Sequence, residues 1–435
     1  MNNVICFGFI AMVLLLGCTS GNQNEIGDKL VNGAIKVEVR QENGKYQLYR
    51  GGSPYAIKGA GLIGDFQSFK SHGGNSIRTW STDNAQELLD QAYENNVTVA
   101  LCFYIKPERH GMDYDDMAAV QDQFEQVKKE VIQFKDHPAL LMWVIGNELN
   151  YSYTNSKVYD AVNDISIMIH ELDPNHPTTT TITVLDKKLA EDLKSRAPDI
   201  DILSMQLYGS IYNLPKYVKD ADWTGPYLVT EWGAIGHWEM QKTTWGAPFE
   251  QNSTQKAQNY LRGYKEIIQP YADQCIGNYV FLWGQKQERT PTWYGMFLPS
   301  NEETEPVDVM HYIWNGEWPE NRTPRLDSVR LDGKFAVDNI YLEPGQEYKA
   351  EVYLFEYDSD SLTFRWEIMH ESKETKEGGD HEEVPERLDL AVKNPTEKQI
   401  TLMTPDTEGA YRLFVYAYDL NGHAAHANIP FYVKL

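Results

Sequence analysis

Eight short runs of apolar and β-branched residues, separated by segments with helical periodicity, constrain the fold of this chain most. The predicted strands are residues 56–62, 75–80, 97–105, 139–148, 178–185, 201–208, 227–232 and 276–283. Several are almost continuously apolar, as expected of strands covered on both faces, and amphipathic segments such as residues 85–94 and 117–134 lie between them. The pattern predicts an α/β fold, a (β/α)8 TIM barrel within residues 36–318. A doubly wound sheet is the alternative, but no Gly-x-Gly-x-x-Gly follows the first strand.

The pattern changes after Trp318. Residues 319–326, rich in proline and polar side chains, indicate a linker. Residues 327–435 contain alternating segments separated by turn residues, which predicts an immunoglobulin-like β-sandwich. The charged residues 371–386 are interpreted as a solvated loop.

The first residues form a short apolar run that ends in Leu15-Leu16-Gly17-Cys18. This run is too short to span a membrane and resembles a bacterial lipoprotein signal, so residues 1–17 are expected to be cleaved and Cys18 to be acylated. Residues 18–35 would form a tether. The chain would then be an outer-membrane lipoprotein exposed at the cell surface, with a periplasm-facing position or an ordinary signal peptide as alternatives.

Charge and cysteine content exclude several functions. The net charge of −24 argues against nucleic acid as a partner, because phosphate binding needs a Lys/Arg surface. Besides Cys18 and one signal-peptide cysteine, only Cys102 and Cys275 remain, both within apolar runs, so neither a disulfide framework nor a cysteine metal site is predicted. No motif indicates a cofactor or a metal, and the sequence does not predict the oligomeric state.

Two glutamates follow buried strands at matching places. Glu148 comes after Gly146-Asn147 at the end of the fourth predicted strand, and Glu231 precedes Trp232-Gly233 at the end of the seventh. Polar residues at strand carboxyl ends form the active site of a β/α barrel. Strands four and seven lie on roughly opposite sides of the ring, so the two carboxylates can face each other across one sugar.

On these motifs, residues 57–283 resemble the clan A retaining glycoside hydrolases. The resemblance implies that Glu148 is the acid/base and Glu231 the nucleophile. It also implies that Asn147 binds the sugar 2-hydroxyl. The alternative is a pair of unrelated surface glutamates.

Three further residues resemble supporting positions of the clan. Arg78 would stand beside the nucleophile, where its charge favours the ionised carboxylate. Tyr208 would hydrogen-bond the nucleophile, and Trp283 would form the floor of the cleavage subsite. The alternatives are a structural ion pair for Arg78 and packing roles for the two aromatic residues.

Tryptophans are concentrated before the linker, and several are expected in loops that follow strands. Trp238, Trp245 and Trp293 are expected to bind sugar, since aromatic rings offer flat apolar faces to sugar C–H groups. Each could instead anchor a loop by packing. His237 and Tyr104 are possible ligand contacts that the sequence does not resolve.

Among clan A families, the chain looks most like glycoside hydrolase family 158, which implies an endo-acting β-1,3-glucanase with a polysaccharide substrate such as laminarin. No domain precedes the barrel in this sequence, so the cleft is expected to be open at both ends. The alternatives are exo- or endo-action on a β-galactoside, β-mannan or β-glucuronide, or a non-catalytic glycan-binding lipoprotein. The sandwich is expected to be a spacer, although Trp366 leaves a glycan-binding role open.

Overall fold

The computed structural model describes residues 30–31, 33–358, 360–374, 379–389 and 392–435. The predicted signal peptide, Cys18 and most of the predicted tether lie outside the described residues. No helix in the described part of the chain is long and apolar enough to cross a membrane.

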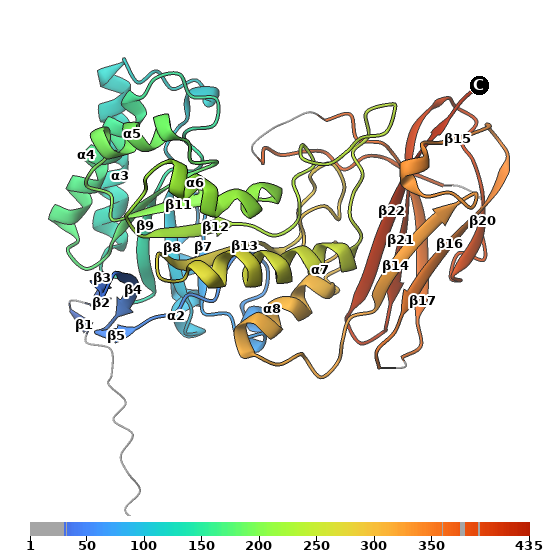
Figure 1. Ribbon diagram of the computed structural model, residues 1–435, viewed down its shortest axis with the longest axis horizontal. Helices are drawn as coiled ribbons and strands as arrows, with labels where there is room; N and C mark the ends of the chain where they lie inside the picture. Colours follow the sequence, from blue (N-terminus) through green and yellow to red (C-terminus); the bar gives the residue numbers. More distant parts are fainter. Residues whose placement is uncertain (1–29, 32, 359, 375–378, 390–391) are drawn as a thin grey trace, which may run out of the picture.

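Eight parallel strands close into a barrel, which confirms the predicted fold class (Figure 1). The strands are β6 (Gly59–Ile63), β7 (Ser76–Arg78), β8 (Thr98–Phe103), β9 (Leu140–Ile145), β10 (Thr178–Ile182), β11 (Ile202–Gln206), β12 (Tyr227–Glu231) and β13 (Cys275–Gly284). In β8 to β12 every residue is buried, because side chains pack inside the barrel or under the surrounding helices. This continuous burial explains the apolar runs in the sequence.

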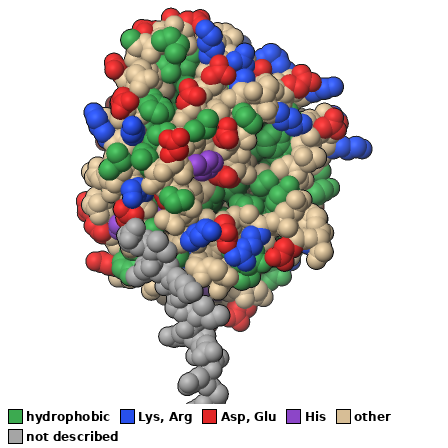
Figure 2. All heavy atoms as spheres, turned by 90° about the vertical axis from the view of Figure 1, so that its left-hand side faces the viewer, with side chains coloured by type: hydrophobic (Ala, Val, Ile, Leu, Met, Phe, Trp, Pro, Cys, Tyr) green, Lys and Arg blue, Asp and Glu red, His purple; other side chains and the backbone are tan. Residues whose placement is uncertain are grey.

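Helices cover the outside of the barrel. They are α1 (Phe66–Ser71), α2 (Ala85–Glu94), α3 (Met117–Phe134), α4 (Lys157–Leu172), α5 (Lys187–Arg196), α6 (Leu214–Asp220), α7 (Ser253–Arg262) and α8 (Glu305–Asn315). Short turns are η1 (Glu108–His110), η2 (Gly209–Asn213), η3 (Gly263–Ile268) and η4 (Gln269–Tyr271). Figure 2 shows the side of the barrel that faces away from the sandwich, where acidic, basic and apolar side chains are interspersed without a continuous basic patch.

Small antiparallel sheets precede the barrel. They comprise β1 (Leu30–Val31), β2 (Ala34–Ile35), β3 (Val37–Glu42), β4 (Lys45–Arg50) and β5 (Ser53–Pro54). Val37 of β3 and Leu48 of β4 pack with Leu141 and Tyr279 of the barrel, so the sheet β3-β4-β5 contributes to the barrel core. Ala34 and Ile35 are buried, which corrects the prediction that the tether extends to residue 35.

Two facing sheets form the sandwich around a core of its own. Their strands are β14 (Arg325–Leu331), β15 (Ile340–Leu342), β16 (Glu347–Phe355), β17 (Thr363–His370), β18 (Arg387–Leu388), β19 (Val392–Lys393), β20 (Gln399–Met403), β21 (Gly409–Tyr418) and β22 (Ala424–Val433), with the turn η5 (Ala336–Asp338). The order is β14-β16-β20-β19 in one sheet and β15-β22-β21-β17-β18 in the other. Strand β14 begins at Arg325, inside the predicted linker, and Thr323 before it is fully buried.

The barrel and the sandwich meet beside α7 and α8 (Figure 1). Buried polar groups join them there. Lys256 of α7 donates to Glu250 at 2.5 Å, and Asn428 of β22 donates to the other oxygen of the same carboxylate at 2.6 Å. A buried charge is tolerated where a partner and hydrogen bonds satisfy it. The contact between the two domains is therefore specific.

Candidate active site

A cleft of about 760 Å³ lies at the carboxyl ends of the barrel strands, and both predicted catalytic glutamates line it. Its lining also includes Trp80, Tyr104, Arg109, His110, Asn147, Tyr151, Gln206, Tyr208, His237, Trp238, Lys242, Phe281, Lys286, Glu288, Arg289 and Gly379. The loops that follow parallel strands meet at this end of the barrel, which explains how residues far apart in sequence share one cavity.

Glu231, the last residue of β12, is held by three donors. Its Oε1 accepts from Arg78 Nη1 at 2.6 Å and from Trp80 Nε1 at 2.8 Å, and its Oε2 accepts from the Tyr208 hydroxyl at 2.6 Å. Arg78 and Glu231 are almost fully buried, so their ion pair is poorly screened by solvent. Burial raises the pKa of Tyr208 well above its usual value, so the phenol remains a donor.

Glu148 follows β9 in a turn that β10 supports. Its backbone φ is 49°, in the left-handed region that non-glycine residues rarely adopt. The Glu148 N–H donates to Thr181 Oγ1 at 3.0 Å, and that hydroxyl is 3.2 Å from the Gly146 carbonyl. Thr180 donates to the Ile145 carbonyl at 2.8 Å. The run of threonines in β10 thus fixes the turn that presents Glu148, a role that was not predicted.

Burial in the cleft, reinforced by the negative charge of Glu231, raises the pKa of Glu148 to about 8. A carboxyl with a raised pKa stays protonated at neutral pH and can donate a proton. The two carboxyl groups therefore differ in their surroundings: Glu148 is protonated at neutral pH, whereas Glu231 is paired with a guanidinium.

Asn147 is oriented by two neighbours. Its Oδ1 accepts from Arg78 Nη2 at 2.8 Å and from Gln206 Nε2 at 2.7 Å. Because both donors meet the carbonyl oxygen, the amide NH2 group is left to donate to a hydroxyl in the cleft. Gln206 was missed by sequence reasoning, although its place at the end of β11 marks it as a candidate.

Aromatic side chains form much of the cleft wall. Trp238 and Tyr104 line it and are each 55% exposed, as a sugar platform requires. Trp80 and Phe281 also line it, with their ring centroids 5.9 Å apart in an edge-to-face arrangement. Trp238 was predicted to bind sugar, whereas neither Trp80 nor Phe281 was assigned to the site.

The prediction for Trp283 is wrong. Its side chain is fully buried outside the cleft, stacked on Trp314 of α8 at 5.4 Å and packed edge-on against Phe69 of α1. The register between β13 and β6 shifts between Val280 and Trp283, so counting along the strand does not give the side-chain direction. Phe281 occupies the cleft wall instead.

Trp293 and Trp245 also lie away from the cleft lining, which corrects their prediction as sugar-binding residues. Trp293 is buried and donates from Nε1 to the Ile235 carbonyl at 2.9 Å, so it anchors the loop after β12. Trp245 packs edge-on against Tyr341 of the sandwich, with ring centroids 5.3 Å apart. Both are packing anchors.

A short segment of the sandwich reaches the cleft, contrary to the prediction of a solvated loop over residues 371–386. Gly379 lines the cavity, and its carbonyl accepts from Lys286 Nζ at 2.9 Å. Glu382 is only 2% exposed, and its Oε2 accepts from the Arg289 N–H at 2.7 Å. The sandwich therefore contributes to the site and is more than a spacer.

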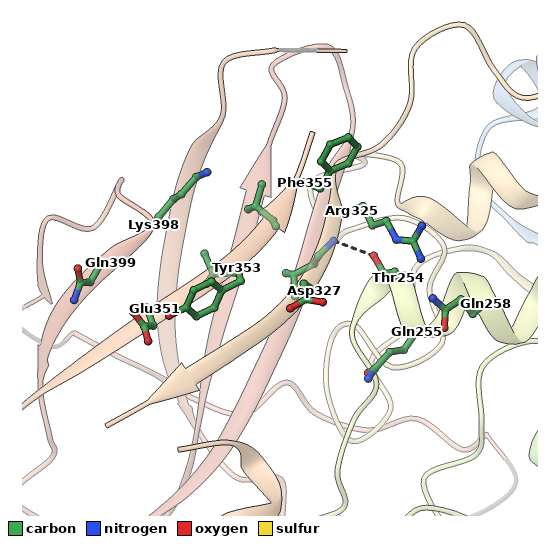
Figure 3. Close-up of a pocket in the computed structure, with 13 residues that line it drawn as sticks. Thr254, Gln255, Gln258, Arg325, Asp327, Glu351, Tyr353, Phe355, Lys398 and Gln399 are labelled. Carbon is green, nitrogen blue, oxygen red and sulfur yellow. Dashed lines mark hydrogen bonds between the residues drawn. The ribbon is translucent and has the colours of Figure 1, made fainter. Parts of the chain in front are cut away.

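A second groove, of about 720 Å³, lies where α7 meets β14 and β16 (Figure 3). Thr254 Oγ1 accepts from the Leu326 N–H at 2.9 Å across it. Neither predicted catalytic glutamate lines this groove. It marks the seam between the domains.

Comparison with known families identifies the barrel. Residues 55–279, just over half of the chain, match the family described as glycosyl hydrolases family 2, TIM barrel domain. The chain belongs to this family. The finding establishes a clan A glycoside hydrolase domain and does not show family 158 in particular. No curated protein matches the sequence.

Solved structures share the fold of this family 2 barrel. Bacteroides uniformis β-glucuronidase 2, covalently bound to cyclophellitol-6-carboxylate aziridine, is 14% identical with a TM-score of 0.50, over 92% of this chain and 48% of that one. Ruminococcus gnavus β-glucuronidase is 15% identical with a TM-score of 0.50, over 65% of this chain and 53% of that one. The chain thus spans about half the length of these relatives, and the likeness shows the fold.

Proposed function

We propose that this chain is a retaining β-glycoside hydrolase in which Glu148 is the acid/base and Glu231 the nucleophile. The observation that carries the proposal is the asymmetry of the two carboxyls in one cleft. The pKa of Glu148 is raised, whereas Glu231 accepts hydrogen bonds from a guanidinium, an indole and a phenol. This difference in environment supports Glu148 as the acid and Glu231 as the nucleophile.

The reaction would proceed in two displacements. Glu231 Oε2, which accepts one hydrogen bond where Oε1 accepts two, attacks the anomeric carbon as the glycosidic C–O bond breaks. The proton of Glu148 passes to the leaving oxygen, and a glycosyl ester forms on Glu231. Water then attacks the same carbon, Glu148 takes its proton, and the ester bond breaks to restore both carboxyls.

Two variants test these roles. Glu231→Gln should abolish turnover, because nothing else supplies the nucleophile. Glu148→Gln should still cleave aryl glycosides with activated leaving groups, which need no proton. Glu383→Gln, whose side chain is 82% exposed, is the control. Proton NMR of the first anomer released tests the stereochemistry, and an inverted product would exclude the retaining mechanism.

The substrate is proposed to be a neutral β-glucan with β-1,3 linkages. Two of the cations that line the cleft already have carboxylate partners: Lys286 pairs with Glu288 at 2.7 Å and Arg109 with Asp380 at 3.4 Å. A substrate carboxylate would have to displace these carboxylates, which favours a neutral sugar. The linkage rests on the resemblance to family 158.

A second candidate is a β-glucuronide, the substrate class in the names of the structural relatives. Product analysis with laminarin, a β-mannan, an aryl β-galactoside and an aryl β-glucuronide separates the candidates. We expect kcat/KM for laminarin to be at least ~10-fold higher than for the other three substrates. This ratio corresponds to a difference of about 1.4 kcal/mol in transition-state binding. Cleavage of the glucuronide alone would replace the neutral-glucan proposal.

The proposed position of cleavage depends on the shape of the cleft. Endo-action was expected from a cleft open at both ends. Gly379 of the sandwich lines the cavity, so the cleft is not bounded by the barrel alone, and an opening at both ends no longer follows from the barrel. The distribution of early products distinguishes random internal cleavage from cleavage near a chain end.

Attachment to the bacterial outer membrane through acylated Cys18 is likewise a proposal. Acyl chains, rather than a spanning helix, would provide the anchor. Cys18→Ser should release the protein from membranes into the soluble fraction, and retention of the variant would contradict lipidation.

A further inference from the structure

Residues 379–382 of the sandwich, here called the strap, bridge two loops of the barrel. On one side, Asp380 lies 3.4 Å from Arg109 Nη1 and 3.6 Å from His110 Nε2 in the loop after β8. On the other side, Gly379 and Glu382 accept from Lys286 and from the Arg289 N–H in the loop after β13. The contacts pair acidic or carbonyl groups of the strap with cationic residues or N–H groups of the barrel.

A buried network joins the sandwich to the barrel near Glu371, which precedes the strap in the sequence. Arg412 of β21, 1% exposed, donates to both oxygens of Glu371 at 2.8 and 2.9 Å and to the Pro248 carbonyl of the barrel at 2.9 Å. Glu250 of the same barrel loop accepts from Thr290 at 2.6 Å, directly beside Arg289. The sandwich and the barrel loops thus share one set of buried hydrogen bonds, which fixes how the sandwich docks on the barrel. The strap itself is held by its own contacts to Arg109, Lys286 and Arg289.

The place of the strap follows from the strand order. In the ring, β6 and β7 lie between β13 and β8, so a bridge between the loops after β13 and β8 spans the mouth on the side of β6 and β7. Glu148 follows β9 and Glu231 ends β12, with β10 and β11 between them on the opposite side. Thr183 follows β10, and Ser210 lies in η2, which follows β11. Both residues line the cleft on this opposite side.

We propose that the strap is the end wall of the sugar-binding cleft and sets the number of sugar units bound on the side of β6 and β7. This inference rests on the proposed glycosidase function. A glycan would extend freely over β10 and β11 but stop at the strap. Cleavage would therefore fall at a fixed distance from one chain end, and the sandwich would determine product length.

The test compares product lengths from reducing-end-labelled β-1,3-gluco-oligosaccharides of increasing size. The variants are Asp380→Ala and the double variant Asp380→Ala/Glu382→Ala. Asp380 is half exposed, so the single variant carries little folding risk even if loss of buried Glu382 destabilises the protein. Glu383→Ala is the matched control, since it removes the same charge from an exposed neighbouring position.

Wild type and Glu383→Ala should release one dominant product length from the start of the reaction. In the strap variants, the ratio of longer products to this one should rise roughly tenfold, equivalent to about 1.4 kcal/mol at one subsite. Identical product lengths in every variant, or a random ladder from wild type, would overturn the end wall alone. Failure to cleave any β-glycoside would instead contradict the glycosidase function.

Discussion

Thr181 accepts the backbone N–H of Glu148 at 3.0 Å, and this bond ties β10 to the turn that carries the proposed acid/base. The turn needs support, because Glu148 has φ 49° and Gly146 before it has φ 78°. A non-glycine residue held in the left-handed region costs on the order of 1 kcal/mol. The neighbouring strand provides the hydrogen bonds that stabilise it.

Thr181→Val should therefore lower kcat roughly tenfold with little change in KM, because the partly buried N–H of Glu148 loses its acceptor at a cost of about 1–3 kcal/mol. Thr181→Ser keeps the hydroxyl and should retain most of the activity. Steady-state kinetics on one substrate decides the matter. Equal kcat values for the Val and Ser variants would show that the hydroxyl does not position Glu148.

Tyr208→Phe should reduce kcat/KM roughly 10- to 100-fold, the effect of removing about 1.5–3 kcal/mol from a hydrogen bond to a charged group. Its hydroxyl is the donor to Glu231 Oε2, at 2.6 Å, on the oxygen proposed to attack. Thermal unfolding should change little, since the ring remains in place. A variant with wild-type kcat/KM would argue against Oε2 as the attacking atom.

The pH dependence should report the raised pKa of Glu148. The proposed acid is active when protonated, so kcat/KM should fall as pH rises through about 8. The fall should be much weaker for an aryl glycoside with an activated leaving group, whose first displacement needs no proton. A steep fall centred near pH 5 with an unactivated substrate would show that the proton donor does not have a raised pKa.

The sequence predicted the elements of the barrel and the residues at strand ends because both depend on local patterns. Arg78, Asn147, Glu148, Tyr208 and Glu231 all lie on the cleft or beside it, since they follow the strand order. Trp283 was misplaced because an irregular register in β13 breaks the alternation of side chains.

The strap could not be predicted in the same way. Its charged residues have the composition of a solvated loop, and their partners lie far away in sequence, as Asp380 and Arg109 do with a separation of 271 residues. Only the docking of the sandwich on the barrel brings them together. Likewise, no local pattern distinguishes Trp245, which packs on Tyr341, from a sugar platform.

The contact between domains should weaken in mild acid because of His426. Burial, reinforced by the positive charge of Lys256, lowers the pKa of His426 to about 3, against an ordinary value of 6.5. Below pH 6.5 the unfolded chain binds a proton that the folded protein excludes, so stability falls as pH drops toward 3. The loss should be on the order of 2 kcal/mol at pH 5.

Urea unfolding of the wild type and of His426→Gln at pH 7 and pH 5 isolates this loss, because the raised pKa of Glu148 changes stability in the opposite direction in both proteins. On going from pH 7 to pH 5, the unfolding free energy of His426→Gln should fall by about 2 kcal/mol less than that of the wild type. His381→Gln, whose side chain is 80% exposed, should behave like the wild type. The nearby Glu250 has a pKa lowered to about 2, so its own contribution is lost at a more acidic pH than this window. An unchanged pH difference in His426→Gln would show that folding does not lower the pKa of His426.

Trp283 and Trp238 should respond to substitution in opposite ways. Trp283→Ala removes a fully buried ring from the stack with Trp314, which should cost about 3–5 kcal/mol of stability. Trp238 is 55% exposed on the cleft wall, so Trp238→Ala should leave the unfolding free energy within about 0.5 kcal/mol of wild type.

Loss of the Trp238 ring should instead raise KM for an oligosaccharide by about threefold to tenfold, the effect of roughly 0.5–1.5 kcal/mol of aromatic contact. Chemical denaturation and steady-state kinetics on both variants separate the roles. If Trp283→Ala kept its stability and lost affinity for the oligosaccharide, the ring would belong to the sugar site after all. Stability and KM of the two variants together therefore test whether Trp283, at the end of β13, points into the packed core and not into the cleft.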